Sequence, residues 1–253
     1  MACGEFGKGK MLSPKKIFKE IKDYFYKRDI VKNKKFKALV TTGPTREYLD
    51  PVRFISNESS GKQGYEIALA LKRMGVKTTL IAGPSNLQVE KGLKIIRVKT
   101  SDEMFSAVKK NLPVDVAVCT AAVSDFKPSK FQRNKMKKKQ AKQKIDLNET
   151  IDILNYLGKN NQFRPRLVIG FSAETEKLLQ NSKSKLKAKN ADWIIANDVS
   201  KKDIGFNKDY NAVTIIRSDG QISQIKKNKK SFIASIISGE IIKKLLINDK
   251  SLN

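Results

Sequence analysis

The chain has 253 residues, 40% of them hydrophobic, so it can bury one substantial core, but no apolar run approaches the roughly 20 residues that a membrane span needs. Histidine is absent and the only cysteines are Cys3 and Cys119, which excludes Ser-His-Asp and Cys-His catalysis, histidine-bound metals and a disulfide framework. The formal charge of +27 comes from 52 basic residues, of which nine are arginine, and the lysines are scattered along the chain. Scattered lysine is weak support for nucleic-acid binding, so we expect neither a nucleic-acid nor a membrane partner.

The N-terminal residues 1–36 differ from the rest of the chain. They lack the apolar core of a signal peptide, which together with the low cysteine content favours a cytoplasmic protein. Ser13 followed by Pro14 is a typical helix start. A short amphipathic helix is predicted by the apolar residues that follow, Ile17, Phe18, Ile21, Tyr24 and Phe25. A basic linker, Lys27 to Lys37, separates this helix from the body.

From Lys37 onward, segments with strand character alternate with segments of helical periodicity. The predicted strands are Ala38–Thr42, Val76–Ala82, Leu93–Val98, Val114–Thr120, Leu167–Phe171 and Trp193–Ala196. The predicted helices are Tyr65–Met74, Met104–Asn111 behind a capping box at Thr100-Ser101-Asp102-Glu103, Glu174–Lys189 and about Ser231–Leu246. Ala212–Arg217 and Gln221–Ile225 flank Ser218-Asp219-Gly220 and predict a β-hairpin. We therefore expect an α/β, Rossmann-like three-layer fold with a mostly parallel sheet, a C-terminal β-hairpin and a ligand site at the C-terminal ends of the strands.

The segment from Thr41 to Gly64 has the composition of a phosphate-binding loop. It leaves the first strand through a Gly-Pro turn and carries Arg46, Asp50, Arg53 and Asn57 before Ser59-Ser60-Gly61-Lys62 at the start of a helix. Anion-binding side chains, small residues and a helix N-terminus together suit a phosphate. The spacing does not fit a Walker A motif or the dinucleotide-binding glycine fingerprint. A purely structural loop remains the alternative on these local features.

The order of residues in this loop is more specific than its composition. Arg46, Asp50-Pro51, Arg53, Ile55-Ser56-Asn57 and Ser59-Ser60-Gly61-Lys62 closely resemble the signature of phosphopantothenate–cysteine ligase. With the motifs below, the resemblance extends from about Lys37 to Ile247. It implies an amide-forming ligase of coenzyme A biosynthesis, unrelated to ATP-grasp enzymes, which activates 4′-phosphopantothenate with CTP and Mg²⁺ to an acyl-cytidylate. This first step releases pyrophosphate. Coupling of the acyl-cytidylate to L-cysteine then gives 4′-phosphopantothenoyl-L-cysteine and releases CMP. Members of this family are dimers, so the resemblance also implies a homodimer.

The segment Ala2-Cys3-Gly4-Glu5-Phe6-Gly7-Lys8-Gly9 resembles the end of the flavin-dependent phosphopantothenoylcysteine decarboxylase domain, which many bacteria fuse ahead of the ligase. In that domain the cysteine matching Cys3 is a proton donor. We expect residues 1–36 to be a remnant of that domain plus a linker, and residues 37–253 to be the ligase domain. The resemblance implies a fused decarboxylase domain in the intact protein and no flavin in this chain.

Small residues follow the predicted strand Val114–Thr120, in the run from Cys119 to Phe126. They allow a base or sugar to lie against the backbone, and Asp125 can accept hydrogen bonds or help to hold a cation. A tightly packed strand end is the structural alternative. The resemblance implies that Cys119, Thr120, Ala121 and Asp125 bind the nucleotide.

The run from Lys127 to Lys144 contains nine basic residues and no acidic one. Such a run is typically a solvated, mobile loop, but it can also close over a triphosphate and shield the reaction from water. Lys135-Met136-Lys137-Lys138 resembles the lysine motif of the family, whose first lysine contacts the nucleotide. The resemblance therefore assigns that contact to Lys135.

Two further segments complete the pattern. The segment from Asn148 to Leu154 opens a predicted helix with Thr150 as N-cap. The family usually has Asn-Pro-Asp here and this chain has Thr-Ile-Asp, so backbone contacts to the nucleotide from Asn148, Glu149, Thr150 and Ile151 are the expectation. Phe171 ends a strand and can stack on a base, or belong to the core. The resemblance implies that Phe171 and the four residues from Asn148 to Ile151 contact the nucleotide. It implies the same for Lys185 and Lys189, which share one face of a predicted helix.

The resemblance also suggests chemical roles. Asn57 is expected to hold the acyl carbonyl of the intermediate, and Arg53 to support its loop or bind phosphate, while Lys135 and the two helix lysines neutralise the triphosphate. Magnesium ligands are not predicted. Two other classes stay open: a basic nucleic-acid-binding protein, and a Rossmann oxidoreductase, which is disfavoured because no Gly-x-Gly-x-x-Gly follows the first strand. The family match at Ala121, Asp125 and Phe171, where a small pyrimidine would fit, implies that CTP is preferred to ATP.

Overall fold

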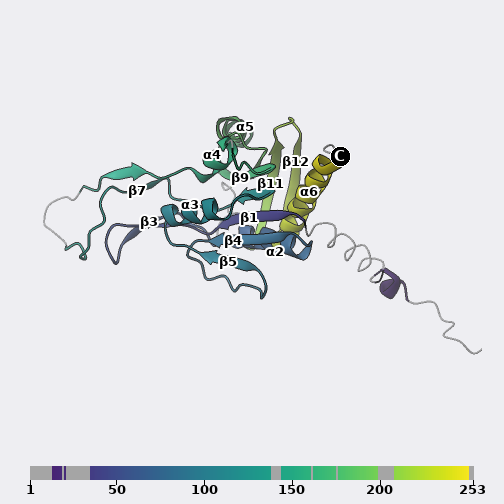
Figure 1. Cartoon of the computed structure of the whole chain (residues 1–253), viewed down its shortest axis with the longest axis horizontal. Helices are drawn as coiled ribbons and strands as arrows, with labels where there is room; N and C mark the ends of the chain where they lie inside the picture. The colour runs from purple at the N-terminus through teal and green to yellow at the C-terminus, as the bar shows by residue number, and fades with distance from the viewer. Residues whose placement is uncertain are drawn as a thin grey trace, which may run out of the picture.

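The expected α/β, Rossmann-like fold is confirmed by a computed structural model (Figure 1). The structure describes residues 13–18, 20, 35–137, 144–160, 162–174, 176–198 and 208–250. Its centre is an eight-stranded sheet in the order β12-β11-β10-β9-β6-β1-β4-β5. In chain order these strands are β1 (Lys37–Thr42), β4 (Lys77–Ala82), β5 (Lys94–Arg97), β6 (Val116–Cys119), β9 (Leu167–Glu174), β10 (Trp193–Asp198), β11 (Tyr210–Arg217) and β12 (Ile222–Lys229).

The strand order creates a crevice at one edge of the sheet. Strands β5, β4, β1, β6, β9 and β10 are parallel, and the predicted hairpin β11–β12 adds two antiparallel strands beside β10. From β1 the chain moves outward through β4 to β5, then returns to the other side of β1 to form β6. Connections that leave β1 and β6 in opposite directions separate at the C-terminal ends of these strands, where open α/β sheets bind ligands.

Five helices cover the two faces of the sheet and complete the three layers. Helices α2 (Lys62–Arg73) and α6 (Lys230–Lys250) cover one face, and α3 (Ser101–Lys110), α4 (Ile153–Lys159) and α5 (Leu178–Lys189) cover the other. The buried strand residues alternate between these layers, as the period-2 side-chain geometry of a strand requires. Ala38 and Val40 of β1 pack with α2 and α6, whereas Leu39 packs in the cluster of α3 and α4. Within the described residues, no helix is both long and apolar enough to cross a lipid bilayer.

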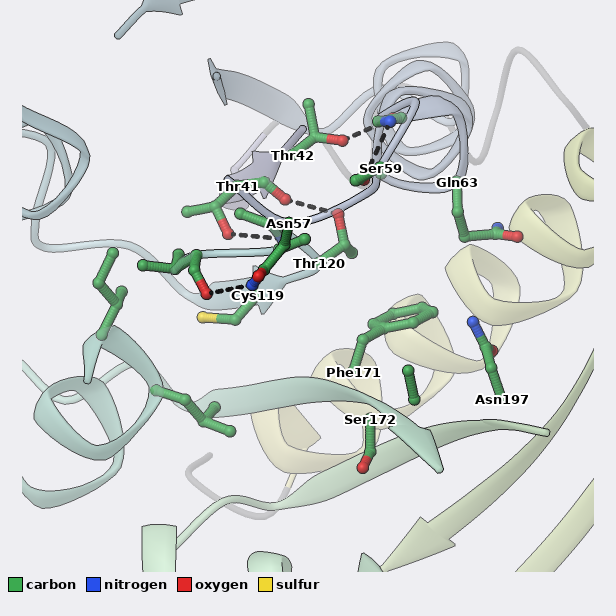
Figure 2. A pocket seen from close by; sticks show the side chains of 18 of the residues that line it. Thr41, Thr42, Asn57, Ser59, Gln63, Cys119, Thr120, Phe171, Ser172 and Asn197 are labelled. Carbon is green, nitrogen blue, oxygen red and sulfur yellow. Dashed lines mark hydrogen bonds between the residues drawn. The ribbon is translucent and has the colours of Figure 1, made fainter. Parts of the chain in front are cut away.

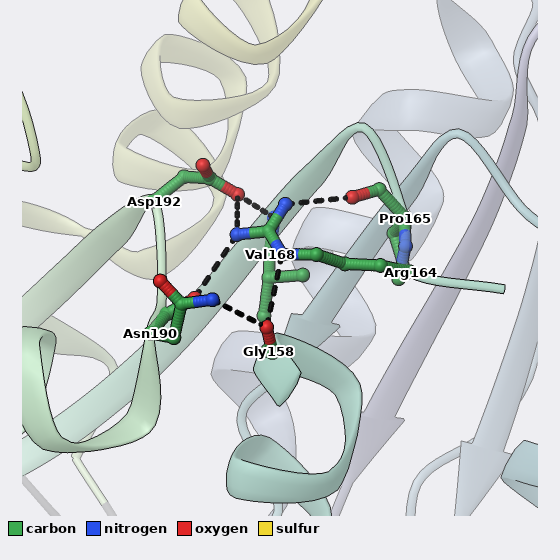
Figure 3. Close-up of polar contacts among 6 residues, drawn as sticks. All are labelled: Gly158, Arg164, Pro165, Val168, Asn190 and Asp192. Carbon is green, nitrogen blue, oxygen red and sulfur yellow. Dashed lines mark hydrogen bonds and ion pairs between the residues drawn. The ribbon is translucent and has the colours of Figure 1, made fainter. Parts of the chain in front are cut away.

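An arginine-centred network ties the helices of the second layer to the N-terminal edge of the sheet (Figure 3). The Arg164 guanidinium donates to the carbonyl oxygens of Gly158 and Asn190 at 3.0 Å and pairs with Asp192 at 3.1 Å. Asp192 also accepts the backbone N–H of Val168 at 2.7 Å. The network joins the ends of α4 and α5 to the starts of β9 and β10, and so fixes these two helices relative to the sheet.

Two short hairpins were not expected from the sequence. The first pairs β2 (Arg46–Tyr48) with β3 (Phe54–Ser56), inside the segment that we expected to be an irregular loop. The second pairs β7 (Phe126–Pro128) with β8 (Leu147–Glu149), so the expected basic loop begins in a strand of this hairpin; its residues 138–143 lie outside the described residues. Both hairpins extend together from one side of the sheet, at the left of Figure 1, and we call them the arm.

Two predicted helix starts are wrong. The helix expected near Thr150 begins at Ile153, because Asp152 is the N-cap and its carboxylate accepts the backbone N–H of Asn155 at 2.8 Å. The helix expected from Glu174 begins at Leu178, because β9 continues through Glu174 as the partner of β10.

The predicted N-terminal helix is described only in part. Residues 14–18 and 20 are helical, and the Ser13 carbonyl accepts the backbone N–H groups of Lys16 and Ile17. Phe18 is 68% exposed, so this residue of the expected apolar face is not packed. Cys3, Ile21, Tyr24 and Phe25 lie outside the described residues. The division of the chain at residue 36 stays a prediction.

Candidate functional site

A cleft of about 880 Å³ lies at the crevice between β1 and β6 (Figure 2). The C-terminal ends of β1, β6, β9 and β10 form its floor, and the first turn of α2 and the start of α4 form parts of its walls. The cleft is lined by these residues predicted from the sequence: Asn57, Cys119, Thr120, Ala121, Asp125, Glu149, Thr150, Ile151, Phe171, Lys185 and Lys189. Segments more than 100 residues apart in sequence therefore meet at one site.

Three predicted residues lie outside the cleft lining, all on the arm. Asn148 pairs with Lys127 in the β7–β8 hairpin. Arg53 and Lys135 belong to neighbouring loops that are joined to one another. Their roles in binding or chemistry stay predictions.

A buried carboxylate joins the loop of Arg53 to that of Lys135. Asp50, which has no exposed surface, accepts backbone N–H groups from Val52 and Arg53 at 2.8 Å and from Met136 at 3.0 Å. Arg53 returns a hydrogen bond to the Met136 carbonyl at 2.9 Å. Although burial alone would raise the pKa of Asp50, the three N–H donors and the Arg53 charge hold this pKa below its usual value. Asp50 therefore fixes the residue next to Lys135 relative to the signature loop.

The first turn of α2 is fixed tightly against the strand ends. Thr42 donates its hydroxyl to the Gly61 carbonyl at 2.6 Å, and Thr120 donates to the Thr41 carbonyl at 2.6 Å. Gly61 has a φ of 72°, a conformation that favours glycine. A Cβ on Gly64 would lie 2.0 Å from the Thr120 hydroxyl, so only glycine allows this approach of helix and strands.

The same turn supplies an electrostatic site for anions. The segment Ser59 to Lys62 lines the cleft, and α2 has no acidic residue in its first turn. Ser59 accepts the Gly61 N–H at 3.2 Å, which helps to form the turn. The positive end of a helix dipole and its free N–H groups bind phosphate well. This part of the cleft is suited to a phosphate chain.

Two neighbouring lysines, at the starts of α2 and α6, add positive charge. Lys62 pairs with Asp209 at 2.6 Å, and Lys230, only 5% exposed, lines the cleft at the start of α6. Burial, together with the neighbouring Lys62 charge, lowers the pKa of Lys230. Sequence reasoning missed Lys230 because it stands at an ordinary helix start with no motif around it. It also assigned no role to Gln63 and Asn197, although both line the cleft.

Asn57 is held in an orientation that leaves one donor available. Its Nδ2 donates to the Val123 carbonyl at 3.0 Å. An amide nitrogen carries two hydrogens, so the second can still donate to a bound group. The contact joins the signature loop to the segment that follows β6.

The two predicted helix lysines face the cleft from α5. Lys189 pairs with Asp152, the N-cap of α4, at 2.8 Å. Lys185, one turn earlier, also lines the cleft. Thr150 uses its hydroxyl to donate to the Ser124 carbonyl at 2.6 Å, which places its backbone beside the strand end rather than at a helix cap.

The thiol of Cys119 is expected to be a poor nucleophile near neutral pH. Burial of the thiol, followed by the negative charge of Asp152, raises the pKa of Cys119 to about 12. Only the thiolate reacts with alkylating reagents, so at pH 8 we expect alkylation in the folded protein to be roughly 1,000-fold slower than in urea. The measurement is iodoacetamide labelling of a Cys3→Ser variant with and without urea. Equal labelling rates would contradict the raised pKa of this thiol.

Comparison with known proteins shows what the chain is similar to. It is 37% identical to the coenzyme A biosynthesis bifunctional protein CoaBC of Bacillus subtilis over 95% of this chain, and 37% identical to that of Haemophilus influenzae over 96%. The chain spans 59–60% of the length of these two relatives.

Solved structures and a family model indicate the same relationship as these two relatives. A crystal structure of the C-terminal domain of CoaBC has a TM-score of 0.70 and 35% identity, covering 84% of this chain and 98% of that domain. A structure of Cab2 in complex with phosphopantothenate-cysteine shares the fold, with a TM-score of 0.69 at 17% identity over 94% of this chain and 97% of that one. The family described as DNA/pantothenate metabolism flavoprotein C-terminal domain matches residues 33–245. The chain therefore belongs to that family, which confirms the relationship indicated by its motifs.

Proposed function

We propose that the cleft catalyses phosphopantothenate–cysteine ligation with CTP. The observation that carries the proposal is the meeting of Asn57, Asp125, Phe171, Lys185 and Lys189 in one cleft at the switch point of the sheet. The resemblance had assigned all five to this reaction from separate motifs. The names of the relatives, coenzyme A biosynthesis proteins, support the same assignment.

The proposed reaction begins with activation of a carboxylate. A carboxylate oxygen of 4′-phosphopantothenate attacks the α-phosphorus of CTP, which forms an acyl-cytidylate and breaks the bond to pyrophosphate. The amine of L-cysteine then attacks the acyl carbon, the amide forms, CMP leaves and the amine loses a proton. Positioning and charge stabilisation dominate such transfers, so the lack of histidine is no obstacle.

The cleft offers a separate part for each group. The α2 N-terminus and the helix lysines Lys185 and Lys189 suit the triphosphate. Asn57 is placed to donate its second amide hydrogen to the acyl oxygen as negative charge develops there. Lys135, in the basic run between β7 and β8, is the further lysine that we assign to the triphosphate.

Magnesium is proposed to enter with the nucleotide. Among the described residues there is no group of three or more cysteine, histidine or acidic side chains placed to hold a metal ion. Magnesium in phosphoryl-transfer sites is commonly held by substrate phosphates and one or two carboxylates. Asp125 on the cleft wall is the carboxylate that we assign to this role.

The arm supports the proposed homodimer. Large apolar side chains are exposed on it, namely Val52, Phe54, Phe126, Phe131, Ile145 and Leu147. Exposed apolar clusters commonly mark protein interfaces, and here the cluster adjoins the cleft. In the intact protein we further propose a fused flavin-dependent decarboxylase domain, with this chain itself binding no flavin, and a cytoplasmic location.

The test is pyrophosphate release from CTP, measured with each substrate omitted in turn. We expect release to require 4′-phosphopantothenate, and 4′-phosphopantothenoyl-L-cysteine to form only when L-cysteine is also present. CTP should support faster release than ATP at matched concentration, because Ala121 and Phe171 suit a small pyrimidine ring. Equal or faster release with ATP would contradict the pyrimidine pocket, and release that ignores phosphopantothenate would contradict the proposed ligase.

A further inference from the structure

The two carboxylate oxygens of Asp152 make different contacts. Oδ1 accepts the backbone N–H of Asn155 at 2.8 Å, which caps helix α4. Oδ2 pairs with Lys189 Nζ at 2.8 Å. A helix cap needs one acceptor oxygen and no charge, and asparagine caps a helix as well as aspartate does. The negative charge and the contact with Lys189 are therefore not explained by the helix start.

The ion pair fixes the far end of a long side chain. The backbone of Lys189 lies against the C-terminal end of α4, because a Cβ on Gly158 would be 2.0 Å from the Lys189 carbonyl oxygen. Asp152 stands at the opposite end of α4, so the Lys189 side chain extends along this helix to reach it. A lysine ammonium sits on a flexible four-carbon stem, and only its partner gives it a fixed position.

The pair belongs to the cleft. Asp152 and Lys189 both line it, together with Lys185 one turn earlier on α5. After burial of the thiol, the negative charge of Asp152 is the further cause that raises the pKa of Cys119, so this carboxylate lies near the end of β6. The ion pair is therefore part of the cleft wall close to the strand ends.

The chemistry of an ammonium group explains what such a carboxylate can do. The group has three hydrogens, and Asp152 Oδ2 uses one of them, so two remain for the oxygens of a bound phosphate. Holding one hydrogen sets the directions of the other two. The carboxylate itself repels a phosphate, so it cannot contribute by direct attraction. Its contribution is the orientation of Lys189.

We infer that Asp152 is a positioning residue for the proposed reaction, and that it holds the ammonium group of Lys189 in the orientation that a bound triphosphate requires. Removing the charge of Asp152 has two opposite effects on affinity, because it removes a repulsion and also releases Lys189. Turnover feels the loss of orientation directly, since a small misplacement of a stabilising group slows a transfer reaction strongly. This inference rests on the proposed function, because it takes the triphosphate of that reaction as the anion.

The experiment compares the unaltered chain with Asp152→Asn, which keeps the cap acceptor and removes the charge. Pyrophosphate release at saturating substrates should slow by roughly tenfold, while the calorimetric dissociation constant of CTP changes by less than about threefold. The melting temperature should stay within about 2 °C, because asparagine also caps a helix. In a Lys189→Met background, adding Asp152→Asn should slow release no further, since the two residues act as a unit.

Asp219→Asn is the matched control. Asp219 also accepts a backbone N–H through its carboxylate, from Gln221 at 3.0 Å, but it lies outside the cleft lining. This variant should change neither the rate of pyrophosphate release nor CTP affinity.

Three results would overturn the inference while leaving the ligase activity intact. They are normal turnover in Asp152→Asn, an equal loss of turnover with and without Lys189, and a loss of turnover that is matched by a fall in melting temperature. Should Asp152→Asn fail to fold, as judged by circular dichroism, Asp152→Ser takes its place, because serine is also a good N-cap. Absence of pyrophosphate release by the unaltered chain would instead overturn the proposed function, and this inference with it.

Discussion

Replacing Asn57 with alanine is expected to lower the turnover rate by roughly 100- to 1,000-fold while changing CTP affinity little. One hydrogen of Asn57 Nδ2 is used by the Val123 carbonyl, and the second is left to donate to a group bound in the cleft that Asn57 lines. Losing a donor to a developing oxyanion typically raises the activation free energy by about 3–4 kcal/mol. The side chain is neutral, so it contributes little to binding a triphosphate. The measurement pairs calorimetric CTP affinity with the rate of pyrophosphate release.

Lys135→Ala is the comparison variant for this experiment. It removes a charge rather than an oriented donor, so it should weaken CTP binding more than the turnover of bound complexes. The assigned role of Asn57 is wrong if Asn57→Ala abolishes CTP binding while turnover per bound complex stays normal.

Replacing Gly64 with alanine is expected to destabilise the fold and weaken CTP binding together. The added Cβ would lie 2.0 Å from the Thr120 hydroxyl and 2.5 Å from that of Thr42. Both hydroxyls donate to backbone carbonyls, so neither can turn away without losing its hydrogen bond. The first turn of α2 must then move away from the strands. Overpacking of this kind lowers the free energy of unfolding by about 1–3 kcal/mol, or roughly 2–4 °C in melting temperature per kcal/mol.

Gly239→Ala is the matched control because Gly239 is also a helical glycine. It lies within α6, and a Cβ there would meet no atom within 4 Å. Alanine is a better helix former than glycine, so this variant should be stabilised by about 0.5–1 kcal/mol. Thermal unfolding of both variants measures the difference. If both changes shifted the melting temperature in the same direction, the close approach at Gly64 would not be what fixes α2.

The central sheet could be predicted because its strands are short apolar runs between clear helical patterns. The run Lys37–Thr42 is buried at every residue but the first, as expected for a central parallel strand. The positions of Cys119 and Phe171 in the cleft could be predicted for the same reason, because each lies at or near the end of such an apolar run. Thr100 was also predicted correctly: its hydroxyl accepts the Glu103 N–H at 3.2 Å at the start of α3.

The arm could not be predicted because its strands carry little local signal. β2, β3, β7 and β8 are three residues long, and their partners are set by contacts such as those of Asp50 rather than by alternation of apolar residues. The N-cap error at Thr150 has a similar cause. Threonine and aspartate are both good N-caps, and only the pairing of β8 with β7 and the hydrogen bond to Ser124 draw Thr150 away from the helix.

The central claim is that this cleft joins a carboxylate of phosphopantothenate to the α-phosphate of CTP. The most direct test uses 4′-phosphopantothenate with ¹⁸O in its carboxylate, incubated with the chain, Mg²⁺, CTP and L-cysteine, with mass spectrometry of the products. The proposed reaction transfers one carboxylate oxygen to the nucleotide, so CMP should carry one ¹⁸O and pyrophosphate none. Label in inorganic phosphate with release of CDP, or unlabelled CMP beside labelled amide product, would contradict it.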